Sequence, residues 1–176
     1  MPTAGEQLGA ALERLARLIP DQLKAAPDLT SRVDGVGFYV FDRKLDARNM
    51  NPEDRASLGK RVWVFTDENE TNPAYSNAEV WFTRRFIIGI GTGSLDSADV
   101  HMFEGIITAA LLQLHHGRTP GGVDLAIDIA PLTLESVLPS RLDHEREPIL
   151  DPSEIQCLAD WTIVAHAARD AIAPKA

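Results

Sequence analysis

Three glycines alternate with other residues in the stretch Gly89-Ile90-Gly91-Thr92-Gly93-Ser94, between a strand-like and a helix-like apolar segment. A glycine-rich turn from a strand into a helix can cradle phosphate with its backbone N–H groups. The stretch has neither spacing typical of nucleotide-binding loops, and no lysine follows it. Asp96 and Asp99 would also place carboxylates where phosphate would bind. We therefore interpret the glycines as a turn that sets the approach of the following helix, or of a neighbouring subunit.

The histidines have spacings that do not favour a metal site. His101 and Glu104 are three residues apart and would share one helix face, but such a pair typically ligates metal when a second helix repeats it. His115 and His116 are adjacent, so their side chains point about 100° apart on a helix rather than together. The sequence predicts no metal and no other cofactor.

The remaining reactive residue types also have simple structural interpretations. Asp124 and Asp128 would lie on one face of a strand, where alternating acids are typical of a solvated surface. No Gly-x-Ser-x-Gly motif is present. Cys157, the single cysteine, lies among alternating apolar residues and is interpreted as a small buried hydrophobe. We predict no catalytic residue, and hence a protein that is not an enzyme.

The composition and net charge of the chain exclude some classes of binding partner. The chain has 176 residues, 44% of them hydrophobic, which suits a single domain with a substantial core. Its net charge of −9 excludes an overall basic footprint for nucleic acid or anionic membranes. The N-terminal segment lacks the apolar core of a signal peptide, and no apolar run reaches the roughly 20 residues of a membrane span.

Two amphipathic helices are predicted. The first follows a leucine-rich stripe at spacings of three and four through residues 8–23, and Pro20 is expected to end or kink it. The second, over 97–116, has Asp96 or Ser97 as its expected cap and ends before Gly117. Each stripe needs a partner surface, so both helices are expected to pack on a sheet.

Five strands are predicted, over residues 33–43, 61–66, 79–90, 123–136 and 155–166. In the segment from Glu79 to Ile90 one face is apolar with Arg84 as the lone exception. The fold class is α+β: a single mainly antiparallel sheet with two helices in the order α-β-β-β-α-β-β, forming one domain over residues 1–176. Long loops are expected at 42–60, 66–78 and 137–152, with a frayed tail at 169–176.

Charged residues gather mainly in the predicted loops and define a candidate subunit or partner interface. Oppositely charged patches on one small domain can pair head to tail and generate a ring or a filament, although a solvated mixed-charge surface would have the same composition. The candidate interface residues are Arg43, Lys44, Arg48, Arg55, Asp67, Glu68, Glu70, Arg85, Asp143, Glu145 and Glu147.

The element order, with three of its segments, resembles the tail terminator proteins of long-tailed bacteriophages and related head–tail joining subunits. The segments are LGAALERLARLIP, DSADVHMFEGIITAALLQL and EIQCLADWTIVAH. The resemblance runs from about Gly5 to His166. The loops at 42–60 and 137–152 are longer than that pattern, so no residue role is transferred individually.

The resemblance implies a structural virion subunit of the phage neck, assembled in the host cytoplasm. Such a subunit forms a homo-oligomeric ring, typically a hexamer. The ring caps the tail tube protein and docks to the head-side connector or neck protein, and DNA passes through it only as cargo. Two alternatives remain open: a small cytoplasmic α+β enzyme or ligand-binding domain, with a cleft near His101, Glu104 and the Gly89–Gly93 turn, and a tube or sheath subunit that forms open polymers.

Overall fold

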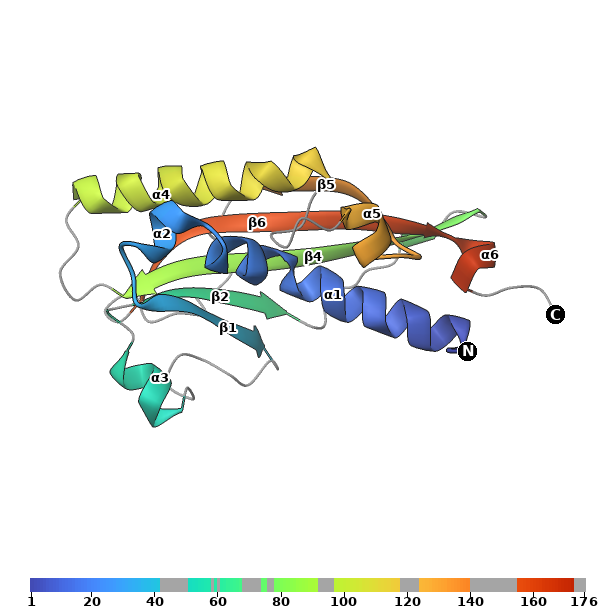
Figure 1. Ribbon diagram of the computed structural model, residues 1–176, viewed down its shortest axis with the longest axis horizontal. Helices are drawn as coiled ribbons and strands as arrows, with labels where there is room; N and C mark the ends of the chain where they lie inside the picture. The colour runs from blue at the N-terminus through green and yellow to red at the C-terminus, as the bar shows by residue number, and fades with distance from the viewer. Residues whose placement is uncertain are drawn as a thin grey trace.

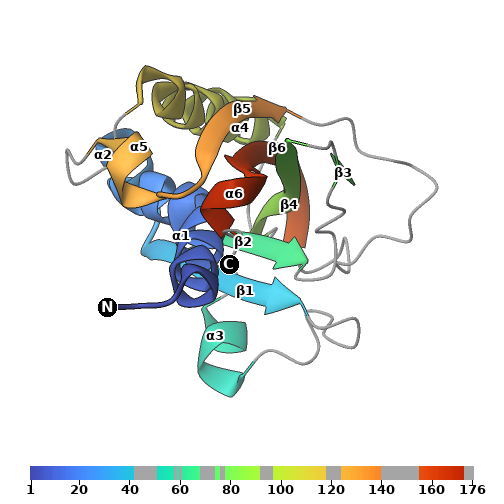
Figure 2. The same cartoon turned by 90° about the vertical axis from the view of Figure 1, so that its right-hand side faces the viewer.

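The fold is a single curved sheet with a layer of helices on one face (Figures 1 and 2). The computed structural model describes residues 1–41, 51–57, 59, 61–67, 74–75, 78–91, 97–117, 124–139 and 155–172. Its elements are α1 (Ala4–Lys24), α2 (Pro27–Thr30), β1 (Gly35–Phe41), α3 (Pro52–Ala56), β2 (Arg61–Asp67), β3 (Ala74–Tyr75), β4 (Glu79–Gly91), α4 (Ser97–Leu112) with a 3₁₀ extension (Gln113–His116), α5 (Leu125–Asp128), β5 (Thr133–Pro139), β6 (Ile155–Ala168) and α6 (Arg169–Ile172).

The sheet has the strand order β1-β2-β4-β6-β5, and the short β3 pairs with β4. β2 and β4 are antiparallel, as predicted for the strands that flank the 66–78 connection. β1 and β2 are parallel, so the sheet is mixed. The residues from 42 to 60 are numerous enough for the crossover that a parallel pair requires. The α+β class is therefore confirmed, with this one parallel pair added to the antiparallel ladders. The predicted order with two helices is wrong, because the described residues also form the short helices α2, α3, α5 and α6 and the short strand β3.

The predicted strand over 123–136 is wrong in its first half. Leu125–Asp128 form helix α5, and the strand β5 begins at Thr133. The carboxylate of Asp124 accepts a hydrogen bond from the N–H of Ala126 at 2.9 Å, an N-terminal cap that favours the helix. Leu125 and Ile129, four residues apart, are both buried. Their spacing satisfies one helical turn as well as strand alternation, so the sequence pattern fits both structures.

Helix α1 is longer than predicted and runs through Pro20. Thr3 and Glu6 form a capping box that fixes its first turn. Further along, Arg14 donates to Asp21 at 2.7 Å and to Asp128 of α5 at 2.6 Å, so one guanidinium joins α1 to α5. The hydrogen bond to Asp128 is the main reason that the pKa of Arg14 is raised.

The core lies between the helices and the sheet. Figure 2 shows α1, α2, α4 and α5 on the same side of the strands, and their buried side chains meet the alternate residues of β2, β4 and β6 that face them. Burial in β4 alternates from Glu79 to Ile88, as the sequence predicts, and is continuous from Ile88 to Gly91. Residues 169–172 of the predicted frayed tail form the short helix α6.

The opposite face of the sheet carries aromatic side chains on β1 and β2. Trp63 and Phe65 are buried, and the ring of Tyr39 lies 5.8 Å from that of Trp63. The hydroxyl of Tyr39 donates to the Asp54 carboxylate on α3, so this face has α3 as a neighbour (Figure 1). Among the described helices, none combines the length and apolar character needed to span a membrane.

Candidate functional site

Most of the predicted interface residues lie outside the described part of the chain. Three lie on described elements: Arg55 in α3, Asp67 at the end of β2, and Arg85 in the middle of β4. Asp67 and Arg85 lie next to each other on neighbouring strands, one residue beyond the Thr66–Phe86 pair of the β2–β4 ladder, and Arg55 lies on α3. The eight outside the described residues are Arg43, Lys44, Arg48, Glu68, Glu70, Asp143, Glu145 and Glu147.

Arg85 forms an ion pair that links strand β4 to strand β6. Its Nε lies 3.0 and 2.8 Å from the two carboxylate oxygens of Asp160 on β6, and its Nη2 also donates to this group. The Asp160 side chain is completely buried, and that of Arg85 is 17% exposed. An ion pair buried this deeply is costly to break, because one charge would be left without a counterion. Arg85 therefore has a structural role in one chain, and a contact with a partner stays a prediction.

His101 and Glu104, two residues of the predicted cleft, lie on an exposed surface. His101 Nδ1 lies 3.1 Å from Glu104 Oε2 on the first turns of α4, and the His101 side chain is 79% exposed. Neither of the two cavities described below is lined by this pair. Gly89 and Gly91 belong to β4 and pair with β6, while Thr92 and Gly93 lie outside the described residues. Within the described residues, no group of three or more acidic, histidine or cysteine side chains is arranged to hold a metal ion.

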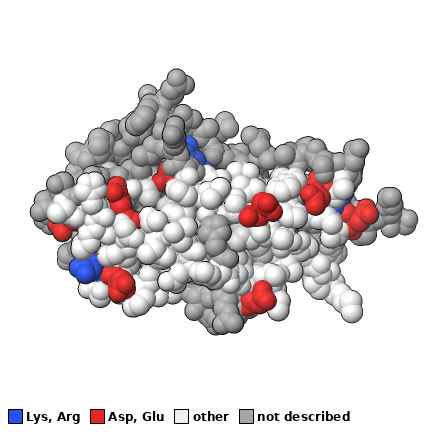
Figure 3. All heavy atoms as spheres, turned by 90° about the horizontal axis from the view of Figure 1, so that it is seen from above, with Lys and Arg blue, Asp and Glu red and all other residues white. Residues whose placement is uncertain are grey.

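The outward surface of α4 is unusual for a helix on the outside of a domain. Its four outermost residues after the first turns are exposed and uncharged; this α4 outer face consists of Gly105, Thr108, Ala109 and Leu112. The charged residues of α4, Asp99 and Glu104, both precede it. Figure 3, which looks down onto α4, shows a mostly uncharged surface on which acidic side chains are scattered. A helix that is largely apolar all round is typically buried, so this face is a candidate contact surface.

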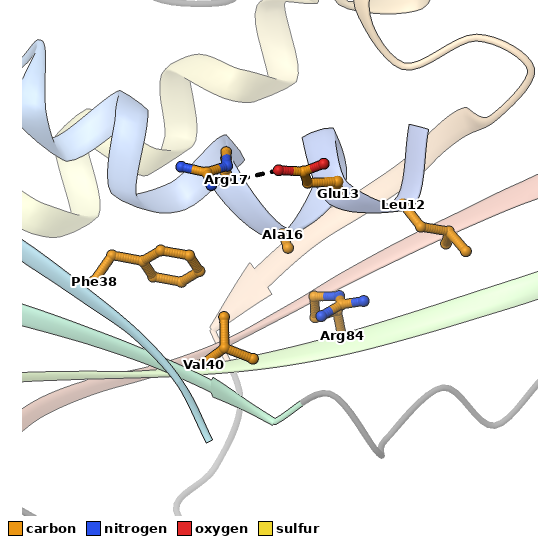
Figure 4. A pocket seen from close by; sticks show the side chains of 7 residues that line it. All are labelled: Leu12, Glu13, Ala16, Arg17, Phe38, Val40 and Arg84. Atoms are coloured by element: carbon orange, nitrogen blue, oxygen red, sulfur yellow. Dashed lines mark hydrogen bonds and ion pairs between the residues drawn. The ribbon is translucent and has the colours of Figure 1, made fainter. Parts of the chain in front are cut away.

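A cavity of about 440 Å³ lies between the N-terminal half of α1 and the sheet (Figure 4). Beside it, the described β2–β4 ladder ends at the pair Thr66–Phe86, whereas the β4–β6 ladder continues to Glu79–Ala168. Arg84, two residues from Phe86 on the same face, therefore faces α1 where the sheet narrows. The lining residues of this α1 cavity are Leu12, Glu13, Ala16, Arg17, Phe38, Val40 and Arg84.

The charges of the α1 cavity come from both of its walls. Arg84 rises from β4 toward α1, and its residue is only 8% exposed. Arg17 lies on α1, and its Nη2 is 3.4 Å from Oε1 of Glu13. The two residues are four apart, so they form an exposed ion pair between successive turns of the helix. The sequence pattern already singled out Arg84 as the charged exception on an apolar face. The sequence pattern could not predict a cavity at this position, because the ends of the ladders depend on how the strands pair.

A second cavity, of about 160 Å³, lies where α1 and α2 meet α4. Gln22, a buried residue of α1, donates from Nε2 to the carbonyl oxygen of Ala110 at 2.9 Å. Its Oε1 is buried without a hydrogen-bond partner among the described residues. This space is large enough for a water molecule to satisfy that oxygen, so the cavity has a sufficient structural explanation.

No protein-family model matches the chain, and a comparison with curated proteins finds no match either.

Proposed function

We propose that the protein is a structural virion subunit of the phage neck, a ring-forming tail terminator that caps the tail tube and joins it to the head connector. The observation that carries the proposal is the α4 outer face: a run of eight residues from Gly105 to Leu112 without a charged side chain, on the outside of the helical layer. In water this face leaves apolar surface unburied, whereas contact with another copy would bury it.

A closed ring would use the α4 outer face as one of the two contact surfaces on each chain. In a ring larger than a dimer, each copy uses two different surfaces, so that the α4 outer face of one copy meets another surface of its neighbour. The assignment of that ring to the phage neck comes from the resemblance in element order. Its three segments correspond to α1, α4 and β6, which are the two longest helices and the longest strand described.

The first experiment measures the mass of the particle in solution. Size-exclusion chromatography with light scattering is expected to give a single closed oligomer, with a hexamer as the leading expectation, and negative-stain images should show rings. A mass equal to one chain over a wide range of concentration would contradict the proposal. Long filaments would instead support a tube or sheath subunit.

The second experiment tests the partner. The purified ring is added to a polymerising tail tube protein, and tube length is measured by electron microscopy. A terminator should shorten the tubes and appear at one end of each. Tubes of unchanged length, with no ring at either end, would contradict the terminator role even if the ring itself forms.

A further inference from the structure

The described residues that line the α1 cavity are more basic than the chain as a whole. They include two guanidinium groups, Arg84 and Arg17, and one carboxylate, Glu13, whereas the chain has a net charge of −9. Guanidinium groups attract anions, and the attraction is stronger at a site that is largely buried, as Arg84 is. An anionic group is therefore the partner that the electrostatics of this cavity favour.

Arg84 is the residue that would hold such an anion. Its side chain comes from the centre of the sheet, is largely buried, and points toward α1 inside the cavity (Figure 4). A guanidinium has five N–H donors, so it can bind an additional acceptor beside any contact that it makes within the chain. Its planar fork matches the two oxygens of a carboxylate, and such charge-assisted hydrogen bonds are among the strong ones.

The remaining walls favour an apolar group next to the anion. Leu12 and Ala16 line the cavity from α1, and Phe38 and Val40 line it from β1. A volume of about 440 Å³ falls within the range of small-ligand sites, which are mostly apolar with a few polar groups that fix orientation. Inorganic anions would leave these walls without contacts.

We propose that the α1 cavity binds a carboxylate carried on an apolar chain. The carboxylate contacts Arg84, Arg17 supports it at the rim, and the apolar chain lies against Phe38 and Val40. This inference concerns one chain and stands independently of the proposed ring. The carboxylate can be a free molecule or a group on another copy of the chain, and the experiment separates these two sources.

The probe is octanoate, titrated calorimetrically at millimolar concentration into the full-length protein. Octan-1-ol has the same chain without the charge, and inorganic phosphate has charge without the chain. Octanoate is expected to bind with one site per chain, and the other two probes much more weakly. Absence of octanoate binding, or equal binding of octan-1-ol, would overturn the proposal.

Four variants locate the site. Ala16→Phe fills the cavity from α1 and should abolish binding, whereas Ala10→Phe places the same ring on the exposed side of the same helix and should not. Arg84→Met should weaken binding at least about tenfold, because hydrogen bonds to charged groups contribute more than neutral ones. Arg17→Gln changes an exposed side chain, so this variant should retain the fold. It should weaken octanoate binding less than Arg84→Met does. Octanoate binding that is unchanged in both Ala16→Phe and Arg84→Met would overturn the assignment to this cavity.

Light scattering on the same samples identifies the source of the carboxylate. If octanoate lowers the oligomer mass, it competes with a carboxylate from another copy. If it binds and the mass stays constant, the cavity takes a free carboxylate. Either result supports the site, and neither depends on whether the oligomer is a tail terminator.

Discussion

Arg84 and Arg85 are neighbours in the sequence, yet the alternation of a strand sends them to opposite faces of β4. Arg85 meets Asp160 on the face away from the helices, and the pair joins β4 to β6. Arg84 lies under α1 beside a cavity. The same side-chain chemistry therefore stabilises the sheet at one position and favours an anionic ligand at the next.

At the residue scale, Gly37 is the glycine on which the aromatic packing depends. A Cβ at this position would overlap ring atoms Cε3 and Cζ3 of Trp63, which is buried. Gly37→Ala should lower the free energy of unfolding by about 1–3 kcal/mol, because a well-packed ring would have to move. Chemical denaturation followed by tryptophan fluorescence measures this.

Gly9→Ala is the matched control for this prediction. Gly9 lies inside α1, where an added Cβ has no atom within 4 Å. Alanine there should raise the free energy of unfolding by about 0.5–1 kcal/mol, since it restricts the unfolded chain and favours the helix. If both variants changed stability equally, steric overlap with Trp63 would not explain the first result.

Tyr39 gives a second residue-scale prediction. Burial, and then the hydrogen bond that its hydroxyl donates to Asp54, raise the pKa of Tyr39 from 10.0 to about 12. Its contribution to stability should be fully present below pH 10. It should be lost as the pH rises through about 12, because the unfolded chain releases the proton first.

Ultraviolet absorbance of the phenolate measures the titration of Tyr39. The chain has two tyrosines, so Tyr75→Phe leaves Tyr39 as the only one. A midpoint near 12 is expected in this variant at alkaline pH. A midpoint near 10 would show that Tyr39 is neither buried nor bonded to Asp54 in solution.

At the element scale, the first turn of α1 should depend on pH through Glu6. The N–H of Thr3 donates to the Glu6 carboxylate at 2.6 Å, and this bond, followed by that from the Thr3 hydroxyl, lowers the pKa of Glu6. The contribution is present above the unfolded pKa near 4.5 and is lost as the pH falls through the lower folded value. Helix α1 should therefore fray at its start in acid.

Thr3→Ala tests this capping box. Loss of an N-cap hydroxyl typically costs about 1 kcal/mol, and the pKa of Glu6 should rise toward its ordinary value. NMR titration of the Glu6 carboxyl gives the pKa, and thermal unfolding gives the stability. An unchanged Glu6 titration in Thr3→Ala would argue against the box.

The elements that could be predicted from the sequence are those whose hydrophobic residues recur with one clear periodicity. The alternation from Glu79 to Ile90 and the leucine stripe of α1 each fit a single structure, and both were confirmed. The segment from Val123 to Ile129 fits two periods, because Leu125 and Ile129 share a face in either structure. A cap at Asp124 and the bond from Arg14 to Asp128 favour the helix, and the second of these joins residues 114 positions apart.

Less of the candidate site could be predicted from the sequence. Arg84 could be identified as a charged residue on an apolar face, but the cavity beside it is lined by α1, β1 and β4, whose arrangement in space the sequence pattern does not give. The α4 outer face was hidden for another reason. The apolar stripe that packs on the sheet dominates the hydrophobic pattern of α4. The uncharged residues on the opposite side of the helix therefore gave no separate signal in the sequence.

At the scale of the whole molecule, the α4 outer face should control assembly. Thr108→Glu places a charge at its centre, where burial against another copy would leave the carboxylate without a partner. The variant should dissociate to smaller particles while its circular dichroism and thermal unfolding stay close to those of the parent. Light scattering measures the mass.

Ala10→Glu serves as the matched control for assembly. Ala10 is exposed on α1, whose outward side already carries charged residues such as Glu13 and Arg17. Oligomer mass should be unchanged in this variant. If Thr108→Glu also retained the full mass, the interface would lie on a surface other than α4.

The position of β6 in the sheet has a consequence for how the protein is made. β6 follows every other strand in the sequence, yet it lies between β4 and β5 and pairs with both. During synthesis, β5 therefore has no partner, and β4 presents a bare edge, until Ile155–Ala168 leave the ribosome. Exposed strand edges of this kind are where nascent chains associate wrongly. Slow translation ahead of residue 155 should therefore increase aggregation, which the insoluble fraction of the expressed protein would measure.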